Sequence, residues 1–189
     1  MFIQKRKPTK NSGIESAAKE AGGIMVSGEH EKYYEEVRIP RAKILKKTKM
    51  HELILESDVF INIPVLKHHK SASVTIAMKN LMGIVWDRWN YHHSGLHQCI
   101  ADTSLYRKPD LNIVDAYRVT LRNGPQRAQL EDVSLKKQLL VSSDIVAIDS
   151  AATKIFAADP QNINYIKFGH QQNVGNMNLK ELKIKKIVA

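Results

Sequence analysis

Apolar and polar residues follow two periods along this chain, and together they predict strands and helices in alternation. Residues 58–63 form a nearly continuous apolar run that Pro64 ends, which is typical of a strand covered on both faces. Two shorter apolar runs predict further strands, and the tail alternates apolar and basic residues as an edge strand would; these segments are 111–114, 139–142 and 182–188.

Apolar spacings of three and four residues predict the helices. Ser73 and Gly83, for example, can cap and end the helix predicted between them. The predicted helices are 12–22, 48–56, 73–83, 94–105, 145–157 and 160–170. The segment 84–94 is rich in large side chains and is predicted to be a loop.

The succession of strands and helices predicts an α/β fold, with a mostly parallel sheet flanked by helices and an antiparallel edge strand. A length of 189 residues fits a single domain. We expect the strands 59–63, 111–114 and 139–142 to be mutually parallel. Their carboxyl ends would then meet at one edge of the sheet, where ligands bind in such folds.

Polar residues suited to binding or catalysis follow these three strands. Lys67 and His69 follow the first strand, Asp115 the second and Asp144 the third. Lys67 and His69 can bind an anion, or a metal through the imidazole, and the alternative is a solvated basic loop. Asp144 has a structural alternative too, as the cap of the helix that follows it.

Lys79 and Asn80 lie off the apolar stripe of their predicted helix, so they either fix an anionic group or face solvent. His93 and His97 have the i, i+4 spacing of a metal pair. However, a helix start is predicted between them and no acidic residue accompanies them. His97 alone, early in its predicted helix, remains a plausible polar site residue.

Asp149 lies within an apolar helical sequence, and a carboxylate buried there needs a partner. The candidates are the strand-end cations Lys67 and Lys79, or a backbone donor in a neighbouring loop. A cation would make Asp149 part of the site, whereas a backbone donor would make it a structural residue.

Charge and composition narrow the class of protein. There are 29 Lys and Arg against 19 Asp and Glu, and the resulting +10 favours anionic partners such as phosphates, carboxylates, nucleic acid or an acidic protein. The single Cys99 excludes a disulfide framework. No apolar stretch approaches the roughly 20 residues of a membrane span, and the basic N-terminus is unlike a secretory signal, so a cytoplasmic protein without membrane contact is expected. Phosphate-loop, dinucleotide-binding and nucleophile-elbow motifs are absent from the sequence.

Several segments together resemble one family. The stretch 58–69, DVFINIPVLKHH, followed by MKNLMG at 78–83, resembles the core signature of the uncharacterised domain-of-unknown-function family 362. Further pieces resemble it in the same order, and they are His97, 109–116, Gly124 with Pro125, and 143–152. The resemblance extends over most of residues 12–175.

The resemblance implies an association with iron–sulfur proteins, since many members of the family carry ferredoxin-type cysteine clusters. Because this chain has only Cys99, no cluster is expected within it, and an iron–sulfur protein becomes a candidate partner. Longer members have another sheet-forming segment before the Ser12 region, so the chain is either a short member or a truncated reading frame. The family is also remotely similar to the amino-terminal part of nickel-dependent lactate racemases, which implies a metal or anionic cofactor near Lys67, His69 and His97.

The leading hypothesis is an enzyme-like domain that acts on a small anionic molecule. Its expected ligand-binding residues are Lys67, Lys79, Asn80 and Asp144, and its expected catalytic residues are His69, His97, Asp115 and Asp149. Five of these residues are expected to converge on one cavity: Lys67, His69, Lys79, His97 and Asp115.

The alternative hypothesis is a basic binding module for nucleic acid or an acidic redox partner. It rests on the cationic segment 41–49 and on the aromatic side chains of Trp86, Trp89 and Tyr91. Without a motif that reads bases, any binding to nucleic acid should be non-specific and steeply salt-dependent.

Overall fold

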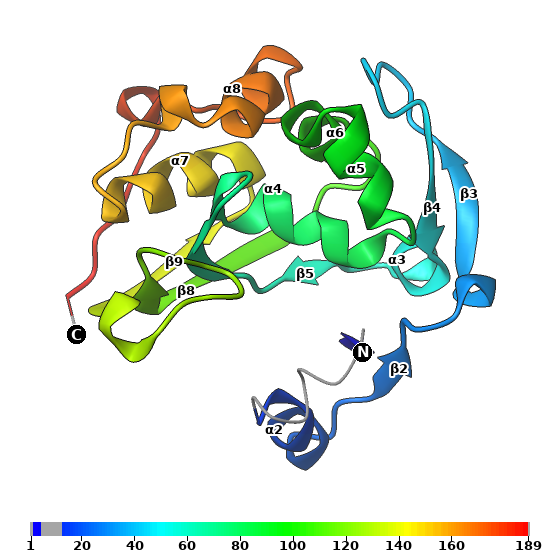
Figure 1. The fold of residues 1–189 in the computed structure, drawn as a ribbon, viewed down its shortest axis with the longest axis horizontal. Coiled ribbons are helices and arrows are strands. Elements are labelled where there is room, and N and C mark those ends of the chain that lie inside the picture. Colours follow the sequence, from blue (N-terminus) through cyan, green and yellow to red (C-terminus); the bar gives the residue numbers. More distant parts are fainter. Residues whose placement is uncertain (1, 5–12, 189) are drawn as a thin grey trace.

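The computed structural model describes residues 2–4 and 13–188. Its first elements form two small sheets (Figure 1). Strand β1 (Phe2–Gln4) pairs in parallel with β2 (Met25–Ser27), and helix α2 (Ile14–Glu20) lies between them in sequence. Strands β3 (Tyr34–Arg38) and β4 (Lys47–His51) form an antiparallel pair, preceded by the 3-10 helix η1 (Glu31–Tyr33) and followed by α3 (Glu52–Glu56). Ser12, the expected cap of the first helix, lies outside the described residues.

The main sheet contains five strands, in which β8 is central. They are β5 (Ile61–Asn62), β6 (Val65–His69), β7 (Ser73–Thr75), β8 (Leu111–Thr120) and β9 (Val133–Ser142). Strands β5 and β6 both pair in parallel with β8, while β7 and β9 are antiparallel to their neighbours. The predicted α/β class is therefore confirmed, and antiparallel strands lie at the edges of the sheet.

The helices that follow β7 in the chain cover one face of this sheet (Figure 1). They are α4 (Ala77–Asn80), α5 (Arg88–Ser94), α6 (Leu96–Thr103), α7 (Ile145–Ile155) and α8 (Asn164–Gln171). Short 3-10 helices join them or follow them: η2 (Leu81–Ile84), η3 (Leu130–Asp132), η4 (Pro160–Asn162) and η5 (Leu179–Glu181). No helix in the described part of the chain is long and apolar enough to cross a membrane.

The expectation that 139–142 runs parallel to 111–114 is wrong. Strands β8 and β9 form an antiparallel hairpin, in which Asn112 pairs with Ser142 and Thr120 pairs with Val133. The connection between them holds η3 but no helix long enough to cross the sheet, as a parallel pairing requires. The carboxyl end of β9 therefore lies beside the start of β8, so Asp144 is at the opposite edge of the sheet from the end of β6.

Four local predictions also need correction. The helix predicted over 73–83 begins only at Ala77, because Ser73–Thr75 pairs with β6 as a strand. The predicted loop 84–94 contains α5, which Asp87 caps by accepting a hydrogen bond from the Asn90 backbone N–H at 3.1 Å. The segment 48–56 begins in β4 rather than in a helix, and the tail 182–188 forms no strand.

Residues 59–66 alternate strictly between exposed and buried side chains. The even-numbered residues of this segment are buried, and they are Phe60, Asn62, Pro64 and Leu66. The odd-numbered ones are exposed, and they are Val59, Ile61, Ile63 and Val65. The prediction that this strand is covered on both faces is therefore wrong in this structure, since the helices bury only one face.

Candidate functional site

A group of cationic side chains gathers where the β6–β7 hairpin approaches α4 and α5. Strand β6 contributes two of them, α4 one and α5 two, and the five are Lys67, His69, Lys79, Arg88 and His92. We call these five residues the cation cluster. None of them forms an ion pair with a carboxylate among the described residues.

Burial, and after it the neighbouring positive charges, lower the pKa values of three side chains of the cation cluster. Burial, reinforced by the charges of Lys79 and His92, lowers the pKa of His69 to about 4. Burial and the charges of Arg88 and Lys67 lower the pKa of Lys79 to about 8. The pKa of His92 is lowered by burial and by Lys79 in the same way. Protonation of these side chains is therefore less favourable than in water.

The β6–β7 turn fixes the orientation of His69. Its Nδ1 accepts hydrogen bonds from the backbone N–H groups of Ser71 and Ala72, each at 3.2 Å. With Nδ1 accepting in the neutral ring, the proton lies on Nε2. His69 can therefore donate one hydrogen bond to a ligand without carrying charge.

Two buried polar atoms beside the same hairpin have no hydrogen-bond partner, and they are Thr75 Oγ1 and His97 Nδ1. Thr75 lies opposite Lys67 in the strand register. The ring of His97 stacks on that of Tyr165 at 5.9 Å between centroids, and Tyr165 in turn donates a hydrogen bond to the Val74 carbonyl. Burial lowers the pKa of His97, while a hydrogen bond to the Ser71 backbone opposes the shift. Unsatisfied buried groups of this kind are uncommon, and they leave hydrogen-bonding capacity beside the cation cluster.

Three predicted site residues bond elsewhere. Asp115 projects from the sheet face opposite the helices, and its Oδ1 accepts from the Tyr117 N–H at 2.8 Å. Asp144 caps α7, as its structural alternative predicted, through Oδ1 and the N–H groups of Val146 and Ala147 at 2.9 Å. Asn80 donates to the buried Asn62 side chain at 2.8 Å. The expected convergence of five residues thus extends to Lys67, His69 and Lys79, with His97 beside the hairpin turn and Asp115 on the other face.

Asp149 is fully buried in α7 and has backbone partners. Its two carboxylate oxygens accept from the N–H groups of Ala77 at 2.7 Å and Met78 at 3.0 Å, at the start of α4. Burial raises its pKa to about 8 in spite of these two donors. Of the two alternatives for Asp149, the structure supports the backbone donor. Asp149 therefore fixes the start of the helix that carries Lys79.

The residues around the hairpin suit an anion better than a metal ion. Among the described residues, no group of three or more His, Cys, Asp or Glu side chains is placed to hold a metal. Nδ1 of His69 is occupied by backbone donors, and Lys67, Lys79 and Arg88 would repel a divalent cation. A phosphate or carboxylate would instead lower the electrostatic energy of all three cations.

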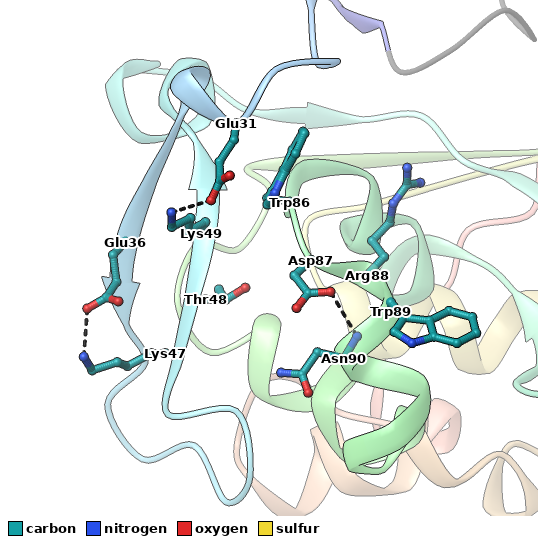
Figure 2. Close-up of a pocket in the computed structure, with 10 residues that line it drawn as sticks. All are labelled: Glu31, Glu36, Lys47, Thr48, Lys49, Trp86, Asp87, Arg88, Trp89 and Asn90. Atoms are coloured by element: carbon teal, nitrogen blue, oxygen red, sulfur yellow. Dashed lines mark hydrogen bonds and ion pairs between the residues drawn. The ribbon is translucent and has the colours of Figure 1, made fainter.

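Sequence reasoning misses Arg88 and His92, because the pattern of 84–94 predicts a loop. Their i, i+4 spacing after Asp87, a good helix cap, is a signal for a helix with both cations on one face. Arg88 and Trp89 also line a groove of about 590 Å³ between β4 and the start of α5, and Figure 2 shows their side chains directed away from Lys47 and Lys49 on its opposite wall. Two ion pairs line one wall of the groove, Lys47 with Glu36 and Lys49 with Glu31, whereas the cation cluster has no such pairs among the described residues.

Comparison with known proteins supports the resemblance seen in the sequence. The family model described as a domain of unknown function, DUF362, matches residues 3–154, which include every residue of the cation cluster. The chain belongs to this family. No solved structure gives a significant match.

A curated relative in the comparison is the "Thylakoid-associated protein sll1697" of Synechocystis sp., which is 32% identical over 117 residues. The match covers 58% of this chain and 36% of the relative, so this DUF362 chain corresponds to only part of that longer protein.

Proposed function

We propose that this DUF362 protein binds a small oxyanion, a phosphate or carboxylate group, at the cation cluster. The observation that carries the proposal is the gathering of Lys67, Lys79 and Arg88 beside two histidines, with no carboxylate paired to the three cations among the described residues. Lys67 and Lys79 are partly buried, whereas Arg88 is exposed. Isolated buried charges are costly, and proteins normally pair them. A bound anion would supply the missing counter-charge.

Individual roles follow from the geometry. Lys67, Arg88 and Lys79 supply charge from three different elements, so they can surround an anion rather than touch it from one side. Nε2 of His69 supplies a neutral donor. Lys79, whose pKa is lowered to about 8, can exchange a proton near neutral pH. This combination supports an enzyme-like role, in which Lys79 is the candidate acid–base residue and Thr75 and His97 complete the polar lining.

Titration of the full-length protein with inorganic phosphate and with acetate tests the proposal. Lys79→Met and Arg88→Met should each weaken phosphate binding by about tenfold or more, equal to about 1.4 kcal/mol. Lys154→Met is the matched control, because Lys154 is an exposed lysine on α7 outside the cluster. Equal losses in Lys79→Met and Lys154→Met would mean that phosphate senses only the overall charge, and the proposal would fail.

The divalent-metal hypothesis for His69 and His97 is tested separately. Metal analysis of protein purified without an affinity tag, compared with His69→Gln and His97→Gln, shows whether these side chains hold an ion. If the wild-type protein contains metal and both variants lack it, the result would favour a metal site over an oxyanion site.

The proposed location is the cytoplasm, and the relative from Synechocystis makes membrane association the alternative, because its printed name describes it as thylakoid-associated. Fractionation of cells into soluble and membrane pools separates the two locations. An acidic iron–sulfur protein remains a proposed partner, and its binding should weaken steeply as salt rises.

A further inference from the structure

An exposed tryptophan lies at the rim of the cation cluster. Trp89 of α5 is 73% exposed, compared with 47% for Tyr117 and 38% for Tyr106. Its indole packs against the ring of His93, with 4.7 Å between the ring centroids and an angle of 62° between the ring planes. A tryptophan ring offers a large apolar surface, and most of this one is available to a ligand.

Helix geometry places Trp89 between two members of the cation cluster. Arg88 precedes it and His92 follows three residues later, and residues three apart on a helix have Cβ atoms about 5–6 Å apart. Arg88 and His92 both lie close enough to Lys79 for the charges to act on each other. Figure 2 shows the side chains of Arg88 and Trp89 leaving α5 on the side away from β4. The indole therefore borders the side chains that would hold an oxyanion.

The other large aromatic side chains of 84–94 are less accessible than Trp89. Tyr91 is fully buried, and its hydroxyl forms a hydrogen bond with Thr103 Oγ1 at 2.6 Å. Trp86 is partly buried, and its ring centroid lies 5.3 Å from that of Tyr34. Proteins that bind single-stranded nucleic acid stack successive bases on several aromatic rings, whereas this segment offers one exposed ring. The arrangement suits a small ligand with one ring better than a nucleic acid strand.

We propose that the ligand of the cation cluster is an oxyanion carried on an aromatic ring, with its phosphate or carboxylate at the cations and its ring stacked on Trp89. This ring-binding position rests on the proposed function, because it needs the oxyanion at the cations. Charge attracts any oxyanion, whereas the indole adds attraction for a ligand that also has a planar ring. Since the indole and two of the basic side chains are neighbours on one helix, the link between ring and oxyanion is short, as in an aryl phosphate or an aryl carboxylate.

Matched pairs of ligands test the proposal in calorimetric titrations of the full chain. Phenyl phosphate and methyl phosphate carry the same anionic group, but only phenyl phosphate has a ring. Benzoate and acetate form the corresponding carboxylate pair. The ring should raise the affinity by about fivefold to tenfold in at least one pair, because aromatic stacking adds to the attraction of the charges. The pair with the larger gain identifies the oxyanion.

Substitution of Trp89 tests whether its indole is the stacking partner. Trp89→Leu should remove most of the preference for the ligand with a ring, whereas affinity for methyl phosphate should stay within about twofold of the wild type. Trp89→Phe keeps a ring and should retain part of the preference. Tyr117→Leu is the matched control, because Tyr117 is also an exposed aromatic residue beside a cation, with Arg118 over its ring at 5.5 Å, but it lies on β8.

The outcomes separate the ring-binding position from the oxyanion site. Equal affinities for the two ligands of each pair would overturn the ring-binding position and leave the oxyanion site in place. A preference that Trp89→Leu keeps, or that Tyr117→Leu lowers equally, would overturn it as well, because the ring would then bind elsewhere. A single-stranded oligonucleotide that binds more tightly than phenyl phosphate, and loses affinity in Trp89→Leu, would assign Trp89 to nucleic acid instead. If no ligand of either pair binds, the proposed function fails and the ring-binding position fails with it.

Discussion

The buried carboxylates of this protein have hydrogen-bond donors, whereas the basic side chains of the cation cluster have no carboxylate partner among the described residues. Asp102 and Asp149 are completely buried, and each has hydrogen-bond donors directed at both carboxylate oxygens. In the cation cluster Lys67, His69 and Lys79 are partly buried while Arg88 and His92 are exposed, and no carboxylate of the described chain pairs with any of them. The carboxylates belong to the architecture, whereas the cations are left with unmet interactions that a ligand can satisfy.

Asp102 gives the clearest case of a structural charge. Its carboxylate, on α6, accepts from three consecutive backbone N–H groups of the loop between β3 and β4, those of Lys43, Ile44 and Leu45, at 2.8 to 3.1 Å. The side-chain amides of Gln98 and Gln172 donate to it as well, each at 2.9 Å. These donors lower the pKa of Asp102 although burial acts to raise it. The carboxylate fastens the β3–β4 hairpin to the helical layer.

The largest expected effect is the loss of Asp149. Asp149→Ala should lower the free energy of unfolding by about 3 kcal/mol or more, because it leaves two buried N–H groups at the start of α4 without an acceptor. Asp149→Asn should cost less, about 1–3 kcal/mol, since one amide oxygen can still accept. Urea unfolding gives both values. Phosphate affinity of the folded Asn variant should stay within about threefold of the wild type, and a loss as large as that of Lys79→Met would make Asp149 a site residue.

A smaller loss is expected for Asp102→Asn. The amide retains one acceptor oxygen, but its NH₂ group then faces backbone donors, so we expect a loss of about 1–3 kcal/mol in urea unfolding. Asp144→Asn is a useful comparison, because Asp144 caps a helix at a partly exposed position. Its loss should be about 1 kcal/mol, the usual contribution of a helix cap. A larger cost at Asp144 than at Asp102 would show that burial does not decide how much a carboxylate stabilises this fold.

The sequence predicts local features better than long-range pairing. The cap at Asp144, the helix that follows it and the α/β class depend on neighbouring residues, and all three are confirmed. The direction of β9 depends on the connection from β8, whose hairpin the apolar pattern does not identify. The same limit explains why the start of α4 was predicted too early, because its start at Ala77 is set by Asp149, 72 residues away in the sequence.

The candidate site is predictable in part for the same reason. Lys67, His69 and Lys79 lie within or beside the segment that carries the family signature, so sequence alone indicates them. Arg88 and His92 come from a segment predicted as a loop, and only the packing of α5 brings them near Lys79. Asp115 fails as a site residue because alternation along β8 places it on the sheet face opposite the helices.

A change of pH should have a moderate effect on the affinity for an anion. Lys79 holds its proton below its pKa of about 8 and loses it above, so affinity should fall as pH rises through this value. Sulfate is the suitable probe, because its charge is constant between pH 6 and 10, whereas phosphate titrates in that range. The neutralised lysine should cost about 1 kcal/mol of attraction, or roughly fivefold in affinity. Lys79→Met should abolish this pH dependence, and a variant that keeps it would assign the titration to another group.

The smallest expected effect is that of Lys79→Met on the free energy of unfolding. It is the most direct test of the contrast between the buried carboxylates and the cation cluster. A structural cation would stabilise the fold through a counter-ion, but Lys79 has none among the described residues and is repelled by Arg88 and Lys67. Methionine fills a similar space without charge, so the free energy of unfolding should stay within about 0.5 kcal/mol of the wild type, or rise. The measurement belongs in phosphate-free buffer, because a bound anion would stabilise the wild type alone. Added phosphate should then raise the melting temperature of the wild type more than that of Lys79→Met. A loss of several kcal/mol in the absence of anion would mean that Lys79 is as structural as Asp149, and the distinction between the buried acidic residues and the cation cluster would fail.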